Sequence, residues 1–379
     1  MIRLRLYQHL ALHHIQHRLH QGEHRLSICL PTDTGKSVIL AALAACAVKR
    51  GRVLVLAHLQ DLVVQLAGEL SRQGLEVRLL MQGHRQVDRP VVVAIPSSLL
   101  SALSDFIQAS SVPVRTLLID EAHHSVEASA YAHILSALEA AYPDECIAAI
   151  GCTATPSRSD RSSMLARLST CAFVREIPQM IREGWLAPFT WVPLVLNLDL
   201  ASLPLTQGED PDYAPEALTR ILLGTALMQE LVRQVVPCLE QRPTLVFAAS
   251  VEHAQQLASL FCQAGCSAVA VSGHLRPSPR EGIYADWRDG RIQIVCNCRL
   301  LTEGFDFPAI AALVIARPTR SPGLYVQMLG RGTRTAPGKR DCLVIDTRLR
   351  MKVSPSSETP LVPCRKAAQR VSWQRTLLR

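Results

Sequence analysis

The sequence predicts an α/β protein built from two tandem domains, each a mainly parallel sheet flanked by helices. Three observations lead to this prediction. The chain has 379 residues, more than one ordinary domain of roughly 100 to 200 residues contains. Hydrophobic residues make up 48% of the chain and charged residues 19%, so the chain has enough apolar material for packed cores. Short apolar runs also alternate with helix-like segments along most of its length.

The first domain is expected over residues 1–198. Its apolar runs have the length and composition of buried strands, and segments with helical periodicity lie between them. The expected strands are Leu26–Leu30, Val53–Ala57, Val91–Ile95, Thr116–Ile119 and Cys146–Cys152. The expected helices are Ser37–Lys49, Gln60–Gln73 and Ala128–Ala141. Strands separated by helices of this length imply a parallel sheet covered on both faces.

A polar, turn-rich stretch separates this domain from the next. Residues 199–215 contain Pro204, Gly208, Asp210, Pro211 and Pro215, and we expect them to form a linker. The second domain is expected over residues 216–348, followed by a basic tail over 349–379. Its expected strands are Thr244–Ala248, Ala268–Ser272, Ile292–Cys296, Ala312–Ala316 and Cys342–Ile345. Its expected helices are Val251–Ala264 and Leu324–Gly330.

The positive charge of the chain is concentrated near its end. The formal net charge is +8, and residues 348–379 hold eight arginine and lysine side chains against Glu358 alone, so 8 − 1 = +7 lies there. A basic tail is a candidate contact for a phosphate backbone. A solvated, frayed terminus explains the same composition, and the sequence does not separate the two.

The apolar segments are too short to cross a membrane. The longest uninterrupted run, Val38–Val48, has eleven residues, against the roughly 20 that a bilayer-spanning helix needs. No apolar segment with a cleavage site follows Met1, so no secretory signal is visible. We therefore expect a cytoplasmic chain with no membrane partner.

The twelve cysteines favour buried thiols over a metal site. No two of them form a Cys-x-x-Cys pair, and Cys29, Cys152 and Cys296 lie inside apolar runs. A zinc site remains the alternative.

The N-terminal segment is rich in histidine. Six of the thirteen histidines lie within residues 9–24, and those from His9 to His17 include a repeat at every fourth position. They could line one face of a helix, and a solvent-exposed polar face is favoured over a metal site. The expected buried residues of this helix are Leu10, Ile15 and Leu19.

The segment Leu26–Ser37 has the order of strand, tight loop and helix that a phosphate-binding loop requires. The backbone of the loop, over Thr32, Asp33, Thr34 and Gly35, could surround phosphate oxygens at the positive end of the following helix. Lys36 could reach the terminal phosphates, and the Ser37 hydroxyl could ligate Mg²⁺.

Two residues depart from the general loop pattern. Leu30 stands where the pattern has its first glycine, and Asp33 stands where a small, uncharged residue is usual. A carboxylate beside a polyphosphate makes nucleotide binding less favourable through charge repulsion, unless the carboxylate faces solvent or a cation. Nucleotide binding is nevertheless favoured over an ordinary loop.

A second part of the same site follows an apolar strand. Leu117–Ile119 leads directly into Asp120 and Glu121, which would lie at the carboxyl end of a buried strand, where α/β sheets bind ligands. Asp120 would hold the magnesium, and Glu121 would orient or deprotonate an attacking water. An acidic strand-end turn is the alternative.

With these residues in place, the chain resembles the DEAD/DEAH-box group of superfamily 2 helicases. Asp120-Glu121-Ala122-His123 resembles motif II. The other matches follow in order: Leu6-Tyr7-Gln8 for the glutamine motif, Leu54–His58 with Gln65 for motif Ia, Cys152–Pro156 for motif III, Thr244–Phe247 for motif IV, Leu301–Asp306 for motif V and Gln327–Arg334 for motif VI. The Tyr7-Gln8 start, the Glu183–Ala187 segment and motif V look most like bacterial RadD and the XPB-type DNA helicases and translocases, which implies a place in DNA repair.

The resemblance implies two tandem RecA-like domains that bind ATP with Mg²⁺. Tyr7 and Gln8 would recognise adenine, and Gly304 and Asp306 would also contact the nucleotide. Arg331 and Arg334 lie beyond the expected linker, so they would complete the ATP site only when the domains close. The residues that would couple nucleotide to nucleic acid are His123, Thr153, Thr155 and Gln327. The candidate contacts to nucleic acid are His58, Ser97, Ser98, Arg299 and Thr302.

The leading hypothesis is an ATP-dependent helicase or translocase that moves on or remodels DNA, whether single-stranded, duplex or branched. An RNA-directed helicase is one alternative, because no residue reports on the 2′-hydroxyl. A nucleic-acid-binding module with an impaired ATP site is a second, prompted by Leu30 and Asp33. The motor part of a larger defence or restriction complex is a third.

Overall fold

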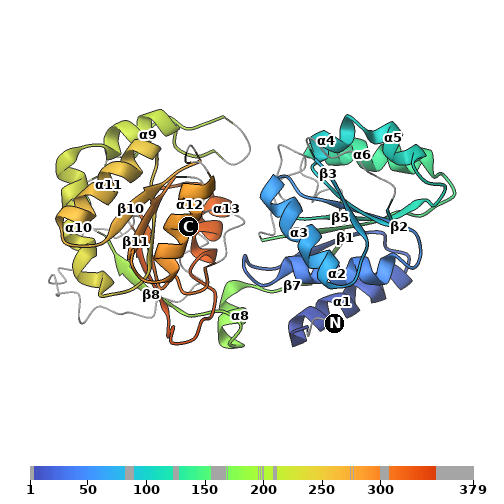
Figure 1. The fold of residues 1–379 in the computed structure, drawn as a ribbon, viewed down its shortest axis with the longest axis horizontal. Coiled ribbons are helices and arrows are strands. Elements are labelled where there is room, and N and C mark those ends of the chain that lie inside the picture. Colours follow the sequence, from blue (N-terminus) through green and yellow to red (C-terminus); the bar gives the residue numbers. More distant parts are fainter. Residues whose placement is uncertain are drawn as a thin grey trace. The chain divides into compact units, whose positions relative to one another are not determined.

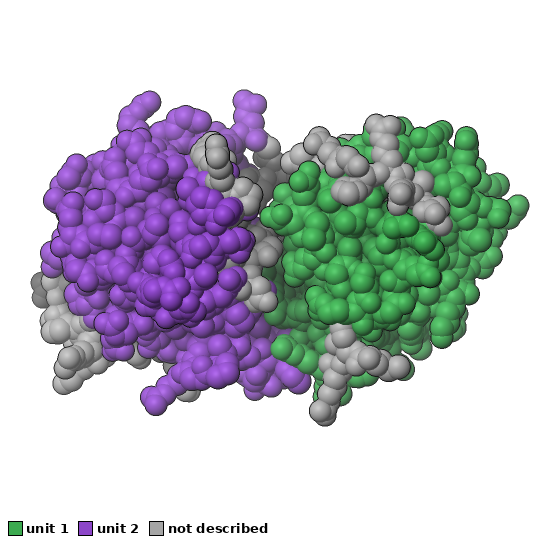
Figure 2. Space-filling view, viewed as in Figure 1, with its two compact units in different colours: residues 1–176 green, residues 177–379 purple. Residues whose placement is uncertain are grey.

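The computed structural model of the chain divides into two compact units, residues 1–176 and 177–379, which are described separately (Figures 1 and 2). The structure describes residues 4–81, 89–122, 128–154, 168, 170–194, 196, 198, 200–207, 211–273, 275, 277–298 and 307–346.

Unit 1 alternates strands and helices. Its strands are β1 (Arg25–Cys29), β2 (Arg52–Leu56), β3 (Val77–Leu80), β4 (Val91–Ala94), β5 (Val114–Ile119), β6 (Ala148–Thr153) and β7 (Thr170–Val174). Its helices are α1 (Leu6–His20), α2 (Lys36–Ala47), α3 (Gln60–Arg72), α4 (Pro96–Leu100), α5 (Leu103–Gln108) and α6 (Ala128–Ala141). All neighbouring strands are parallel, in the order β3-β4-β2-β5-β6-β1-β7. The predicted parallel sheet is confirmed.

Two strands of this sheet were not predicted. Both β3 and β7 lie at its edges, where one side of each strand remains partly accessible. In β3 only Leu80 is buried, and Arg78 interrupts the apolar run. Edge strands of this kind lack the continuous apolar signal of central ones.

Helices cover both faces of the sheet (Figure 1). On one face, α4, α5 and α6 contribute to a core in which Leu99, Phe106 and Ile134 are fully buried. On the other face, α2 contacts α1 and α3. Helix α3 buries Leu62, Val63, Leu66, Ala67, Glu69 and Leu70. Their helical spacing gives one apolar stripe, which packs inward.

Unit 2 repeats this architecture. Its strands are β8 (Phe189–Pro193), β9 (Thr244–Phe247), β10 (Ala268–Val271), β11 (Ile294–Asn297), β12 (Ala312–Ile315) and β13 (Cys342–Asp346). Its helices are α8 (Ile177–Arg182), α9 (Pro215–Leu222), α10 (Thr225–Leu239), α11 (Val251–Gln263), α12 (Pro277–Arg288) and α13 (Pro322–Gly330). The strands are parallel, in the order β10-β11-β9-β12-β13-β8.

Alternate side chains of the second sheet enter two different cores. Val246 of β9 packs with residues of α10 and α11. Its neighbours Leu245 and Phe247 pack on the opposite face with Trp287 of α12 and Met328 of α13. This alternation is the period of a strand covered on both sides.

The predicted end of the first domain, at residue 198, is wrong. The division falls after Glu176, and β8 pairs with β13 in the second sheet. Strand β8 is largely apolar in sequence, but only Trp191 within it is buried. Because β8 comes before the expected linker in sequence but joins the sheet that follows it, its composition gave no sign of the unit to which it belongs.

The segment expected to be a linker is also part of unit 2. Leu205 and Tyr213 form an antiparallel bridge, and Leu200 and Tyr213 are buried with Leu218 and Ala249 in a small apolar cluster. The apolar side chains of the segment fix it to the end of β9.

The N-terminal helix exposes most of its histidines. His9, His13, His14, His17 and His20 of α1 are exposed. Ile15 is buried as predicted and Leu19 is half-buried, whereas Leu10 is 37% exposed, so its predicted burial is wrong. Within the described residues, no group of three or more His, Cys, Asp or Glu side chains is placed to hold a metal ion.

Cys29, Cys152 and Cys296, which lie inside apolar runs of the sequence, are buried free thiols, as predicted. Burial raises the pKa of the Cys29 thiol to about 12. None of the helices in the described part of the chain is long and apolar enough to cross a membrane.

The start of α11 generates a prediction about pH. His253 is 1% exposed and its Nδ1 accepts a hydrogen bond of 3.2 Å from the Ala249 amide. Burial lowers the His253 pKa to about 4. The unfolded chain therefore binds the extra proton between about pH 6.5 and pH 4, so stability falls as pH falls through that window.

We expect the unfolding free energy of wild type to fall by up to about 3 kcal/mol as the pH falls through this window. A His253→Asn variant should not show this loss. Denaturant unfolding of both proteins at a series of pH values measures the difference. Parallel pH profiles for the two proteins would contradict it.

Candidate functional site

The predicted phosphate loop lies between β1 and α2. The Leu30 amide donates to the Thr153 carbonyl at 2.9 Å, so Leu30 extends the strand rather than opening the loop. Asp33 and Gly35 then take positive φ angles of 66° and 74°. Short polar residues tolerate this left-handed backbone better than other L-residues do, which gives Asp33 a conformational role.

Two residues of α1 form hydrogen bonds to the backbone of the loop. The Tyr7 hydroxyl donates to the Thr34 carbonyl at 2.5 Å, and Gln8 Nε2 donates to the same oxygen at 3.3 Å. A Cβ on Gly35 would lie 2.7 Å from Gln8 Nε2. Tyr7 and Gln8 therefore anchor the loop, and their predicted contact with adenine remains a prediction.

Three charged side chains meet beside the loop. Lys36 is the first residue of α2, and its Nζ lies 3.0 Å from Glu121 Oε1. Asp120 follows β5, its amide donates to the Leu56 carbonyl at 2.9 Å, and its side chain is 4% exposed. Glu121 has a φ of 47°, a strained backbone of the kind that collects at functional sites.

The electrostatics of this cluster show a shortage of positive charge. Burial and the Glu121 carboxylate raise the pKa of Asp120 to about 7, although Lys36 acts in the opposite direction. Burial lowers the pKa of Lys36, but Glu121 and Asp120 outweigh it and the net shift is upward. Two largely buried carboxylates thus face one ammonium group, and a divalent cation would offset the excess negative charge.

The residues around the cluster fit a magnesium ion and a polyphosphate. Carboxylate and hydroxyl oxygens, as offered by Asp120 and Ser37, are the hard donors that Mg²⁺ prefers. The Thr32 hydroxyl oxygen is buried and has no hydrogen-bond partner within the described residues. Loop amides at the start of α2 add donors for phosphate oxygens.

Other predicted residues lie at the same edge of the sheet. Thr153 ends β6, which lies between β1 and β5, and is 1% exposed. Ser97 and Ser98 are in the first turn of α4, after β4. His58 follows β2, and its charge lowers the pKa of Asp120, so it lies within electrostatic reach of the cluster.

The predicted arginines lie in unit 2, in the turn after α13. Arg331 is 4% exposed and Arg334 is half-buried, and Gln327 lies on the helix itself. Gly332 lets the turn approach the sheet, because a Cβ there would lie 2.9 Å from Leu313 Cδ1 and would also collide with Cys342 Sγ. A side chain at this position would push the arginine turn away from β12 and β13.

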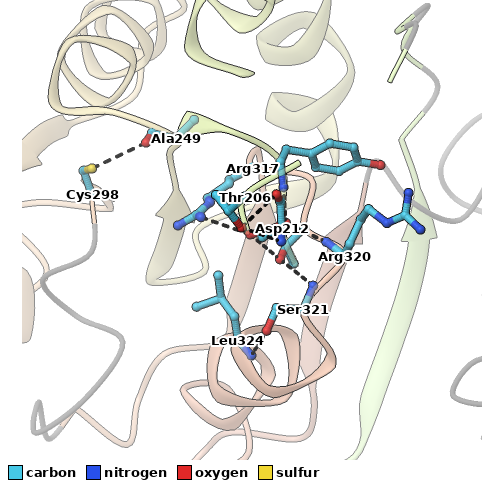
Figure 3. Close-up of polar contacts among 10 residues, drawn as sticks. Thr206, Asp212, Ala249, Cys298, Arg317, Arg320, Ser321 and Leu324 are labelled. Atoms are coloured by element: carbon cyan, nitrogen blue, oxygen red, sulfur yellow. Dashed lines mark hydrogen bonds and ion pairs between the residues drawn. The ribbon is translucent and has the colours of Figure 1, made fainter. Parts of the chain in front are cut away.

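The start of α13 is fixed by Asp212, which sequence reasoning missed. Figure 3 shows the Asp212 carboxylate accepting from the amide of Arg320 at 2.8 Å and from a guanidinium nitrogen of Arg317 at 3.2 Å. It also accepts from the Thr319 hydroxyl at 2.8 Å. The Ser321 hydroxyl then caps the helix by accepting from the Leu324 amide. No local motif marks this role of Asp212, since its partners at the start of α13 lie more than a hundred positions away.

A cavity of about 580 Å³ lies in unit 2. Its lining includes Thr219 and Arg220 of α9, Ser250 at the N-cap of α11, and Cys298 after β11. These side chains carry no signal in the sequence, because none belongs to a charged or glycine-rich run. The remaining predicted residues, His123, Thr155, Arg299, Thr302, Gly304 and Asp306, lie outside the described residues.

Comparison with known families places this geometry in a class. Residues 1–158 match the family model of the type III restriction enzyme res subunit, and residues 226–336 match that of the helicase conserved C-terminal domain. Two parallel-sheet units with a phosphate loop and an arginine turn are the architecture of helicase motors. The two matches, in this order along one chain, support a superfamily 2 helicase.

Individual relatives agree with this assignment. The chain is 29% identical to Irc3 of Saccharomyces cerevisiae over 90% of this chain and 51% of that protein. It is 28% identical to irc3 of Schizosaccharomyces pombe over 91% and 57%. Both are named as candidate ATP-dependent helicases, the second a mitochondrial one. The chain thus spans about half the length of these relatives.

A solved structure has the same fold. A fragment of an HsdR-type subunit of a type I restriction enzyme from Vibrio vulnificus superposes with a TM-score of 0.68 at 22% identity, over 90% of this chain and 63% of that one. Two tandem RecA-like domains are therefore confirmed. The narrower resemblance to RadD and XPB-type proteins stays a prediction.

The close approach of Gly35 to Gln8 is testable. In Gly35→Ala the added methyl group collides with the Gln8 amide and displaces the loop, so we expect affinity for Mg·ATP to fall at least about tenfold. The control is Gly74→Ala, since Gly74 has a similar φ of 79° but no atom within 4 Å of the place that an added methyl group would take. Calorimetric titration measures both, and equal losses in the two variants would refute the role of the contact.

Proposed function

We propose that the chain is a nucleic-acid-dependent ATPase that uses hydrolysis to move on or remodel DNA. The observation that carries the proposal is the buried cluster of Lys36, Asp120 and Glu121 beside a phosphate loop. Hydrolysis of a triphosphate needs cations on the phosphates and a base near the attacking water, and this cluster contains both kinds of group. The two matching family models and the names of the Irc3 relatives support the same activity.

Each residue of unit 1 would have a defined task. Lys36 would move from Glu121 to the terminal phosphates, which carry more negative charge than one carboxylate. Ser37 and Asp120 would hold the magnesium, which would supply charge neutralisation of the phosphates. Glu121, freed from Lys36, would accept a proton from the attacking water or orient it.

The arginines of unit 2 would stabilise charge that develops during hydrolysis. The planar guanidinium groups of Arg331 and Arg334 could each form two hydrogen bonds to phosphate oxygens. Because they belong to unit 2 and Lys36 belongs to unit 1, the proposal requires the two units to meet during turnover. A ligand that contacts both units stabilises only the arrangement in which they meet, so binding and hydrolysis of ATP would drive movement.

Nucleic acid would contact backbone amides, hydroxyls and a few basic groups at the carboxyl edges of the sheets. In unit 1 the candidates are His58, Ser97 and Ser98. In unit 2 the candidate surface is the cavity whose lining includes Arg220 and Ser250. Such groups contact phosphates and leave bases unread. DNA is the proposed partner, with RNA as the alternative to be tested.

A second candidate function is the motor part of a restriction or defence complex. The res-subunit family model over residues 1–158 favours it, as does the fold shared with a restriction subunit. The two functions share one ATP site and differ in partner proteins. A role in DNA repair, suggested by the resemblance to RadD, is a further proposal of the same kind.

The first test removes the two key groups. Lys36→Ala takes away the phosphate contact and Glu121→Gln takes away the base, so each should lower stimulated ATP turnover at least about 100-fold. Glu121→Gln should still bind ATP. Phosphate release is measured with single-stranded, duplex and forked DNA and with RNA. Stimulation by RNA alone would replace DNA as the partner, and turnover unaffected by either variant would refute the proposed site.

The charge of Asp33 is the second test. In Asp33→Asn the backbone keeps a residue that tolerates the left-handed conformation, but the carboxylate next to the phosphates is removed. We expect the KM for ATP to fall about threefold, since the residue is half-buried and solvent screens much of its field. The matched control is Asp105→Asn, an exposed acid on α5. A KM that rises in Asp33→Asn would show that the carboxylate helps binding.

A further inference from the structure

The turn that carries Arg331 and Arg334 is held by bonds to its backbone carbonyls. The Thr333 hydroxyl donates to the Gly330 carbonyl at 2.7 Å. The Ala187 amide donates to the Thr333 carbonyl at 2.7 Å. The carbonyls of Gly332 and Arg334 have a different partner, the ammonium group of Lys339.

Lys339 bonds to three carbonyls at once. Its Nζ lies 2.9 Å from the Gly332 oxygen, 2.7 Å from the Arg334 oxygen and 3.1 Å from the Pro308 oxygen. An ammonium group has three donors, and three carbonyl oxygens lie within hydrogen-bonding distance of it. Hydrogen bonds from a charged donor are shorter and stronger than neutral ones. The side chain is half-buried, so water screens the bonds only partly.

The three carbonyls belong to two separate parts of the sequence. Gly332 and Arg334 belong to the arginine turn, whereas Pro308 comes two positions after Asp306, the end of the segment Leu301–Asp306 that resembles motif V. One side chain therefore joins the arginine turn to the stretch that leaves the predicted motif V. A displacement at Pro308 would pass to the arginines through the Lys339 ammonium.

We propose that Lys339 is a positioning residue, which fixes the arginine turn and couples it to the segment after motif V. The proposal rests on the proposed function, because it gives Arg331 and Arg334 a part in hydrolysis. Lys339 itself is not required to touch ATP or nucleic acid. It sets where the two guanidinium groups point, and small errors in such placement lower rates strongly.

The test compares Lys339→Met with Arg340→Met. Both variants remove one positive charge, but Arg340 is exposed and lies outside the arginine turn. Lys339→Met should lower kcat for stimulated ATP hydrolysis at least about tenfold and change the KM for ATP by less than about twofold, because the phosphate loop is untouched. Arg340→Met should keep wild-type values. A wild-type kcat in Lys339→Met would overturn the proposal, and so would a lower kcat that comes with an equal loss of ATP affinity.

Lys339→Arg provides a second variant that keeps the charge. The planar guanidinium fork cannot direct donors at three converging carbonyls, so kcat should remain below wild type. Full activity in this variant would show that charge alone matters and would contradict the proposed positioning role of Lys339.

Hydrogen exchange separates this proposal from the function on which it rests. Amides in the peptide that contains Arg331 to Arg334 should exchange at least about tenfold faster in Lys339→Met than in wild type. This measurement does not need an active enzyme, so an inactive wild type would count against the ATPase alone. Unchanged exchange in that peptide would overturn the proposed positioning role of Lys339.

Discussion

The structure depends on one electrostatic imbalance, two largely buried carboxylates that share a single ammonium group. Asp120 and Glu121 are held beside Lys36, and the ion pair of 3.0 Å between Lys36 and Glu121 does not remove the excess negative charge. Burying charges is unfavourable unless they are paired. A site of this kind is stabilised by a ligand that brings a divalent cation for the carboxylates and anionic oxygens for the lysine, as Mg·ATP does.

The parallel sheet is what allows this imbalance to form. The phosphate loop follows β1 and Asp120 follows β5, while β6 lies between them. Carboxyl ends of parallel strands meet at one edge, so groups distant in sequence come together there. In unit 2, residues distant in sequence likewise meet at α13. Asp212 bonds to the segment at the start of the helix, and Lys339 bonds to the turn at its end.

Much of this could be predicted from the sequence, and the exceptions have physical causes. Central strands such as β2 and β9 are continuous apolar runs, and Gly35-Lys36-Ser37 is a local pattern tied to one loop geometry. Edge strand β8 comes before the turn-rich segment in sequence but belongs to the sheet that follows it, so its sheet could not be identified. Asp212 and Lys339 act on backbone groups that are distant in sequence or carry no side-chain signal, which leaves no motif to detect.

The most direct test is a structure of the protein with Mg²⁺ and a non-hydrolysable ATP analogue, in which the distance from Lys36 Nζ to the Glu121 carboxylate is measured. We expect this distance to exceed the 3.0 Å of the present structure, with Lys36 turned to the terminal phosphate and Asp120 beside the metal. A nucleotide bound with the Lys36–Glu121 pair intact, or bound away from the loop, would contradict the account.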